Sequence, residues 1–216
     1  MALPIDNPPA LRRLILERLK DTLPHADLES AARASALSAA NTVVRDYLPR
    51  VPVAAAVLVP IVDREDALSV LLTRRASHLR NHAGQISFPG GRIESSDAGP
   101  IGAALREAEE EIGLTREHVS FAGYLDPQLV VSGYWVTPVV GFVRPGFALT
   151  LDPKEVASTF EVPLAHVLDS ANHLPRARTL GTITVPSYEI PFGPYVIWGA
   201  TARMLVELYR VLRRDV

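Results

Sequence analysis

The chain has 216 residues, of which 48% are hydrophobic and 21% are charged, as is typical of a globular protein with one sizeable core. Its 22 Lys and Arg residues are balanced by 24 Asp and Glu residues, which argues against the clustered basic surface of a nucleic-acid-binding protein. It has no cysteine, so disulfides, thiolate metal sites and cysteine nucleophiles are excluded, and a reducing compartment is expected.

The N-terminal segment has no apolar core of the kind that a secretory signal needs. The longest apolar run, near residues 51–62, contains Pro52 and Pro60 and is shorter than the roughly 20 residues that span a bilayer. We therefore expect a cytoplasmic protein with no membrane partner.

The first 48 residues predict helices. Residues 8–22 form an amphipathic pattern, and an alanine-rich stretch from about 28 to 44 is also typical of a helix. Apolar residues recur at helical spacing in the first of these: Leu11, Leu14, Ile15 and Leu19. Prolines then interrupt the helical pattern. We interpret residues 1–48 as a helical N-terminal extension packed on a main domain that spans residues 49–216.

The main domain mixes strands with a few unevenly spaced helices. Apolar, β-branched segments at 54–62 and 68–73 predict a hairpin, and a polar loop rich in Arg and His follows at 74–87. After a turn at 88–91, a helix is predicted at 101–112, ended by Gly113. Further strands are expected at 117–125, 134–144 and 178–184, and further helices at 164–170 and 198–212. This pattern favours an α+β fold or an α/β/α sandwich over a regular βαβ array.

The helix at 101–112 carries an unusual group of glutamates. At about 100° per residue, Glu107 and Glu111 share one face, Glu110 lies beside them and Glu109 points away. Like charges at these spacings, near the end of a helix, are destabilising, although Arg106 can offset some of the cost through an i,i+4 pair with Glu110. A hard cation held between the carboxylates would relieve the rest, and Mg²⁺ favours such ligands. The alternative is an acidic face that is merely solvated.

The surrounding residues favour the metal site. A Gly90-Gly91 turn upstream can bring a backbone carbonyl to the metal, and a loop with Asp97 leads on to the helix. The segment Arg106–Leu114 resembles the second half of the Nudix hydrolase motif at every fixed position. In the first half, the loop from Gly91 to Arg106 is one residue longer than usual, and Asp97 stands where the family has glutamate. The resemblance implies a Nudix-type α/β/α sandwich with a mixed central sheet.

A second motif is similar to the coenzyme A pyrophosphatase branch of that family. The positions that fit this branch are Thr73, Arg75, Arg80, Gly84 and Phe88–Gly91. Softer similarities extend the resemblance over roughly residues 50–212. The loop offers Arg74, Arg75, Arg80 and His82 as cations for a substrate with several phosphates, because guanidinium groups suit phosphate oxygens. The alternative is that Arg75 and Arg80 are structural and pair with carboxylates of the acidic helix.

The resemblance implies that water attacks one phosphorus of a diphosphate with the help of Mg²⁺ or Mn²⁺. Glu107, Glu111, Glu110 and the Gly91 carbonyl are the expected metal ligands. Arg106 is expected to orient a carboxylate, and Glu110 and a distant glutamate, Glu155, are the candidates for the catalytic base.

Two rival functions remain open. Within the same family, the substrate could be ADP-ribose, a dinucleotide or another nucleoside diphosphate derivative. A different class would be an inactive Nudix module that only binds a nucleotide or a protein, although such a module would be expected to lose some of its glutamates. The N-terminal helices are candidates for a core cap, an acyl-chain pocket or a homodimer contact.

Overall fold

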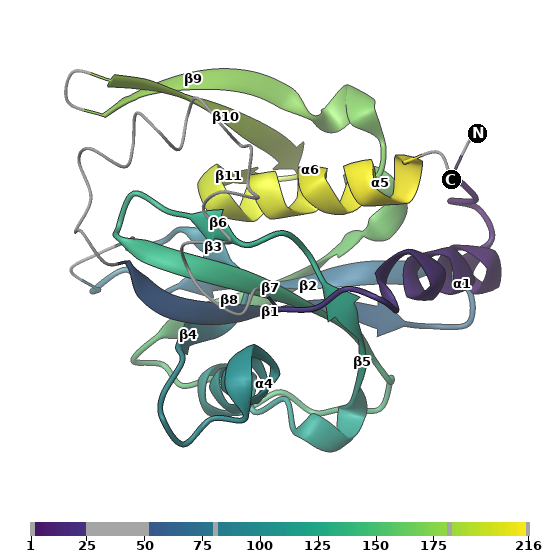
Figure 1. Ribbon diagram of the computed structural model, residues 1–216, viewed down its shortest axis with the longest axis horizontal. Coiled ribbons are helices and arrows are strands. Elements are labelled where there is room, and N and C mark those ends of the chain that lie inside the picture. Colours follow the sequence, from purple (N-terminus) through teal and green to yellow (C-terminus); the bar gives the residue numbers. More distant parts are fainter. Residues whose placement is uncertain (1–2, 25–51, 80–81, 181–182, 215–216) are drawn as a thin grey trace.

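The computed structural model describes residues 3–24, 52–79, 82–180 and 183–214, and its layers are visible in Figure 1. The helix predicted at 28–44 and the side chain of Arg80 lie outside these residues. The central sheet contains β1 (Val53–Asp63), β2 (Leu68–Arg75), β3 (Ile86–Ser87), β4 (Gly90–Arg92), β5 (Val119–Tyr124), β6 (Gln128–Leu129), β7 (Tyr134–Val143) and β8 (Val156–Pro163). A second sheet contains β9 (Leu174–Leu180), β10 (Ile183–Phe192) and β11 (Tyr195–Trp198). The helices are α1 (Pro8–Leu19), α4 (Gly99–Ile112), α5 (Leu164–Val167) and α6 (Gly199–Arg213), with 3-10 turns at Arg116–His118 and Ser170–Asn172.

The central sheet is mixed, as predicted. Its strands follow the order β3-β2-β1-β7-β5, and β4, β6 and β8 pair with β1, β7 and β2. Strand β1 runs parallel to β7 from Val53 opposite Tyr134 to Val62 opposite Val143, whereas its pairs with β2 and β4 are antiparallel. From Ala55 to Val62, nearly every residue of β1 is buried. Such a continuous apolar run is expected of a strand that is covered on both faces.

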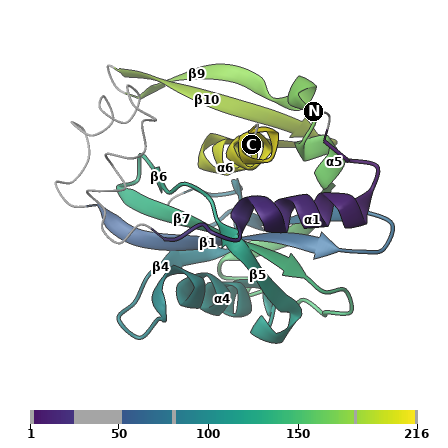
Figure 2. The same ribbon diagram turned by 45° about the vertical axis from the view of Figure 1, so that its right-hand side comes forward.

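Helices cover both faces of this sheet. Helix α4 lies on one face, and α1, α5 and α6 lie on the other (Figures 1 and 2). Helix α6 is buried on two sides because it lies between the central sheet and the three-stranded sheet. The fold is therefore an α/β/α sandwich of the α+β class. Within the described residues, no helix is both long and apolar enough to cross a membrane.

Helix α1 packs against the main domain, as the apolar spacing predicted. Leu11, Ile15 and Leu19 are fully buried in the core that also contains α6. The residues after the helix reach the outer strand β5, where the Tyr124 N–H donates a hydrogen bond of 2.8 Å to Oγ1 of Thr22. The division of the chain at residues 48 and 49 stays a prediction.

Several sequence predictions need correction. The single strand predicted at 178–184 is wrong, because those positions span the end of β9 and the start of β10. Strand β8 was not predicted. The loop predicted at 74–87 is shorter, because β2 continues to Arg75 and β3 occupies Ile86–Ser87. The hairpin of β1 and β2, the strand β7 and the helices α4 and α6 are confirmed within two residues at most of their ends.

Candidate active site on helix α4

Small side chains bring α4 close to the sheet. Ala103, Ala104 and Ala108 are fully buried against β1 and its neighbours, together with Ile112 at the end of the helix. The helix stops at Gly113, which adopts φ 70° and ψ 16°, the left-handed conformation that favours glycine. This face fixes the rotation of the helix, so that the glutamates are directed toward the edge where β4 and the loop after β2 meet α4.

Arg106 is the centre of a hydrogen-bond network at this edge. Its guanidinium donates to both carboxylate oxygens of Asp97, at 3.0 and 3.1 Å, and to the carbonyl oxygen of Arg92 at 3.1 Å. The same group donates to Glu107 at 3.0 Å and to Glu110 at 2.9 Å, which confirms the predicted i,i+4 pair. These hydrogen bonds lower the pKa of Asp97. Asp97 therefore serves as a bidentate partner of Arg106, and the stretched loop still delivers a carboxylate to this arginine.

Gly91 lies against the carboxylate of Glu107. A Cβ atom at this position would lie 2.5 Å from Cδ of Glu107, so a larger residue would displace the glutamate. Gly90 is equally confined, because a Cβ there would lie 2.6 Å from Cα of Val57 in β1. The two glycines allow β4 to pass between β1 and α4, and this close approach places the Gly91 backbone beside the glutamates.

Glu111 is the most buried carboxylate of the helix, with a side chain that is 4% exposed. Burial raises its pKa to about 8; Arg75 opposes the rise, and the negative charges of Glu155 and Glu107 add to it. Nη1 of Arg75 lies 3.9 Å from Oε1 of Glu111, and Nε of Arg75 is buried without a hydrogen-bond partner in the described structure. Glu155, which is distant in sequence, is thus close enough for its charge to act on both Glu111 and Glu107.

The NUDIX domain family matches residues 52–179, which is more than half of the chain and includes all of these groups. The chain belongs to the Nudix family. Relatives from Salmonella paratyphi B, Salmonella newport and Salmonella enteritidis are each 43% identical over 158 residues, which cover 71% of this chain and 80% of the relative. Each of them bears the name uncharacterized Nudix hydrolase NudL. The protein is therefore a Nudix hydrolase.

Solved structures give remote likenesses. A Nudix hydrolase from M. smegmatis, RenU, is 24% identical, with a TM-score of 0.46 over 55% of this chain and 74% of that one. A MutT/nudix family protein from Enterococcus faecalis is 15% identical, with a TM-score of 0.47 over 87% and 74% of the two chains.

Nudix hydrolases generally use divalent metal cations, and the residues of this site fit such an ion. Carboxylate and carbonyl oxygens are the ligands that Mg²⁺ and Mn²⁺ prefer. The burial of Glu111 among like charges is unfavourable, and a cation would relieve it. In the part of the chain that the structure describes, no three Asp, Glu or His side chains converge as a metal site, and Arg106 forms ion pairs with both Glu107 and Glu110. The ligand set of Glu107, Glu110, Glu111 and Gly91 stays a prediction.

The four predicted substrate-binding residues differ in their positions and in their contacts. Arg75 is directed toward Glu111, which is the structural pairing that the sequence left as an alternative. Arg74, the preceding residue on β2, is exposed. His82 is exposed, with φ 58°, and its Nδ1 lies 2.9 Å from Oε1 of Gln85. Arg80 lies outside the described residues. A role in substrate binding stays a prediction for all four.

The glycine beside Glu107 leads to a first prediction. We expect Gly91→Ala to lower kcat by about 10²-fold, because a displacement of a catalytic group by about 1 Å costs that much. Stability should fall little, since the backbone there is extended and the side chain that must move is a flexible glutamate. Steady-state kinetics with Mg²⁺ and thermal unfolding would check both points.

Gly102→Ala is the matched control. Gly102 lies on α4, where a Cβ would meet its nearest neighbours at 3.4 Å, and alanine favours a helix by roughly 1 kcal/mol over glycine. This variant should keep its activity and unfold at a higher temperature. Equal activity of Gly91→Ala and the wild type would contradict the placement of Glu107 in the site.

Proposed function

We propose that this Nudix hydrolase cleaves the diphosphate of coenzyme A or its derivatives, giving 4′-phosphopantetheine and adenosine 3′,5′-bisphosphate. The observation that carries the proposal is the position of Arg75. This arginine belongs to the loop motif that resembles the coenzyme A pyrophosphatase branch, and its guanidinium lies beside Glu111 of the acidic helix, with Nε buried and unpartnered. A cation for phosphate and a carboxylate for metal are thus adjacent.

Each residue has a defined role in this proposal. Glu107, Glu110 and Glu111 would hold Mg²⁺ or Mn²⁺, with the Gly91 carbonyl as a further ligand. The metal, when bound, neutralises phosphate charge and lowers the pKa of water. Arg106 holds Glu107 and Glu110 in place through its hydrogen bonds.

Glu155 accepts the proton of the attacking water, while Arg75, together with Arg74, Arg80 and His82, binds phosphate oxygens. The water oxygen bonds to one phosphorus, and the bridging oxygen leaves with the other. A general base of this kind typically contributes about 10²–10⁴-fold. Glu110 is the second candidate for the base, but its side chain is 60% exposed and bound to Arg106, which favours Glu155.

A substrate panel tests the proposal. Coenzyme A, an acyl-coenzyme A, ADP-ribose, NADH and dGTP would each be incubated with the protein and Mg²⁺, then Mn²⁺, and the products identified by mass spectrometry. We expect the fastest release from a coenzyme A substrate, because only this class in the panel combines a diphosphate with a 3′-phosphate for Arg74, Arg75 and Arg80. Faster hydrolysis of ADP-ribose would favour the rival function, and binding without hydrolysis of any substrate would favour an inactive module. A cytoplasmic location and a homodimer stay predictions.

A further inference from the structure

The segment that carries Glu155 is a tight turn built by Asp152. The Asp152 side chain accepts a hydrogen bond of 2.9 Å from the Lys154 N–H, and its carbonyl accepts bonds of 3.0 and 2.9 Å from the N–H groups of Glu155 and Val156. Pro153 occupies the turn position for which its fixed φ is suited. The four residues Asp152–Glu155 therefore form a turn that closes on itself through both the backbone and the side chain of Asp152.

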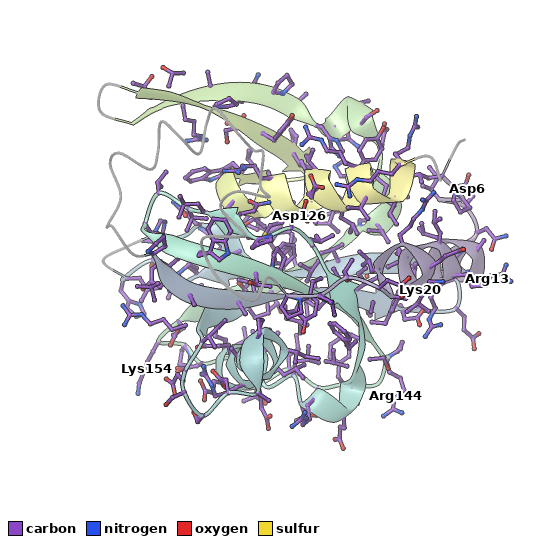
Figure 3. The ribbon with its side chains drawn as sticks, in the orientation of Figure 1. Asp6, Arg13, Lys20, Asp126, Arg144 and Lys154 are labelled. Atoms are coloured by element: carbon purple, nitrogen blue, oxygen red, sulfur yellow. The ribbon has the colours of Figure 1, made fainter. Side chains whose placement is uncertain are left out.

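This turn is tied to the end of the acidic helix. The Asp152 N–H donates a bond of 2.9 Å to the carbonyl oxygen of Glu111, and the Thr150 N–H donates a bond of 3.0 Å to that of Ile112. The contact is close, because a Cβ at Gly113 would lie 2.8 Å from the Thr150 nitrogen. Lys154 lies on the same side of the central sheet as α4 (Figure 3). The turn thus takes its position from the backbone of Glu111, whose pKa is raised in part by the charge of Glu155.

A second attachment holds the other side of the turn. The Ala76 N–H donates a bond of 2.8 Å to the carbonyl oxygen of Glu155, and Nε2 of His78 lies 3.1 Å from the carbonyl oxygen of Lys154. A carbonyl oxygen can only accept, so Nε2 is the donor of this bond. The turn is therefore held between the end of α4 and the start of the loop that follows β2.

From these contacts we infer that Asp152 is a positioning residue for Glu155, and that His78 supports the same turn from the opposite side. The inference rests on the role proposed above for Glu155. A glutamate on an unsupported loop would sample many positions, and an error of about 1 Å in the place of a reacting group costs about 10²-fold in rate. Backbone bonds tie the turn to Glu111, and the Asp152 side chain restricts the turn further by holding the Lys154 N–H next to Glu155.

Substitution of Asp152 tests the inference. We expect Asp152→Ala to lower kcat by about 10- to 100-fold with KM changed by no more than about twofold, because the reacting geometry is affected and substrate binding is not. Asp152→Asn should restore most of the activity, since its amide oxygen can accept the same bond from the backbone. The assays would use the substrate that the wild type hydrolyses fastest, so that the result does not depend on coenzyme A being that substrate.

Asp169→Ala is the matched control. The Asp169 side chain accepts a bond of the same kind, 2.9 Å from the Ala171 N–H, after α5 on the opposite face of the sheet. Its loss should leave kcat within about twofold of the wild type, because this site is remote from the reacting groups. An equal fall in kcat for Asp169→Ala and Asp152→Ala would overturn the inference. The loss of any hydrogen bond between an Asp side chain and the backbone of its turn would then explain the result.

Amide hydrogen exchange of the metal-free proteins gives a second readout. The Lys154 and Glu155 amides should exchange faster in Asp152→Ala than in the wild type and in Asp152→Asn, and His78→Ala should accelerate them to a smaller extent. Unchanged exchange would overturn the inference even if activity fell.

Glu155→Gln separates the inference from the proposed role of the base. A large loss of activity in Glu155→Gln together with full activity in Asp152→Ala would overturn the positioning role alone. Full activity in Glu155→Gln would overturn both roles, while the identity of the substrate would still be decided by the panel. If Asp152→Ala does not fold, the pair Asp152→Asn and His78→Ala gives the same comparison of kcat with amide exchange.

Discussion

Replacement of Glu111 by glutamine should abolish most activity without harming the fold. We expect kcat to fall by at least about 10²-fold, because metal assistance stabilises a transition state by several kcal/mol and each 1.36 kcal/mol is about tenfold in rate. Burial disfavours the charge of Glu111 more than Arg75 and a backbone hydrogen bond from Gly90 favour it. The side chain is buried, and its nearest cation, Arg75, is 3.9 Å away. Turnover with saturating Mg²⁺ and thermal unfolding without metal would be measured on the same preparations.

The pH dependence of unfolding sharpens this expectation. Burial raises the pKa of Glu111 from an ordinary value of 4.5 to about 8 in the folded protein. The contribution of such a group to stability is full below its unfolded pKa and is lost as pH rises through its folded pKa. The metal-free wild type should therefore lose stability between about pH 5 and 8 relative to Glu111→Gln, which has no charge to bury.

Glu109→Gln is the control for this experiment. Glu109 lies on the same helix, but it is exposed on the side turned away from the site, so its charge can be removed without effect on either measurement. Activity of Glu111→Gln close to that of the wild type would contradict the assignment of the metal site. A large loss of stability in the same variant would contradict the raised pKa.

Removal of the Arg106 side chain should have the second large effect. We expect Arg106→Ala to lower kcat by about 10²-fold or more, because Glu107 and Glu110 lose the group that holds them. Stability should fall by roughly 1–3 kcal/mol, since the Asp97 side chain, which is 5% exposed, loses both of its charge-assisted hydrogen bonds. Kinetics and chemical denaturation would measure the two effects.

Chemical denaturation of the wild type and of Arg106→Ala at decreasing pH provides a further check. The hydrogen bonds from Arg106 lower the pKa of Asp97, so the stabilisation that they provide is present above the ordinary value of 3.8 and is lost as pH falls through the folded value. The difference in the free energy of unfolding between Arg106→Ala and the wild type should therefore become smaller at acid pH. Arg116→Ala is the control, because Arg116 is exposed and lines a surface groove together with Arg106. An equal loss of activity and stability in Arg106→Ala and Arg116→Ala would contradict a specific role for Arg106.

The sequence was most informative where a short local pattern determines the structure. Helix α4 was predicted from its alanines, its glutamates and Gly113, and its rotation followed from the helical period, with Glu111 inward and Glu109 outward. The Arg106–Glu110 pair was predicted for the same reason, because its two members are four residues apart. Such features need no knowledge of the rest of the chain.

Features that depend on tertiary contacts were not predictable in the same way. The segment Val156–Pro163 has no clear alternation of apolar and polar residues. Among the described strands, β8 pairs only with β2, and most of its side chains are partly exposed. Nothing local to Asp97 indicates that it will receive two hydrogen bonds from Arg106. The raised pKa of Glu111 likewise depends on burial by strands that are distant in sequence.

The contact between α1 and β5 has a consequence that is separate from catalysis. Among the described strands, β5 is at one edge of the central sheet, and Leu19 and Thr22 lie against it at Gly123 and Tyr124. Open edge strands recruit strands of other molecules and lead to aggregation, and natural proteins block them with helices or loops. The hydrogen bond from Tyr124 to Thr22 occupies a backbone donor that would otherwise face outward. We therefore expect the N-terminal segment, from α1 to Thr22, to oppose self-association of the folded protein along this edge.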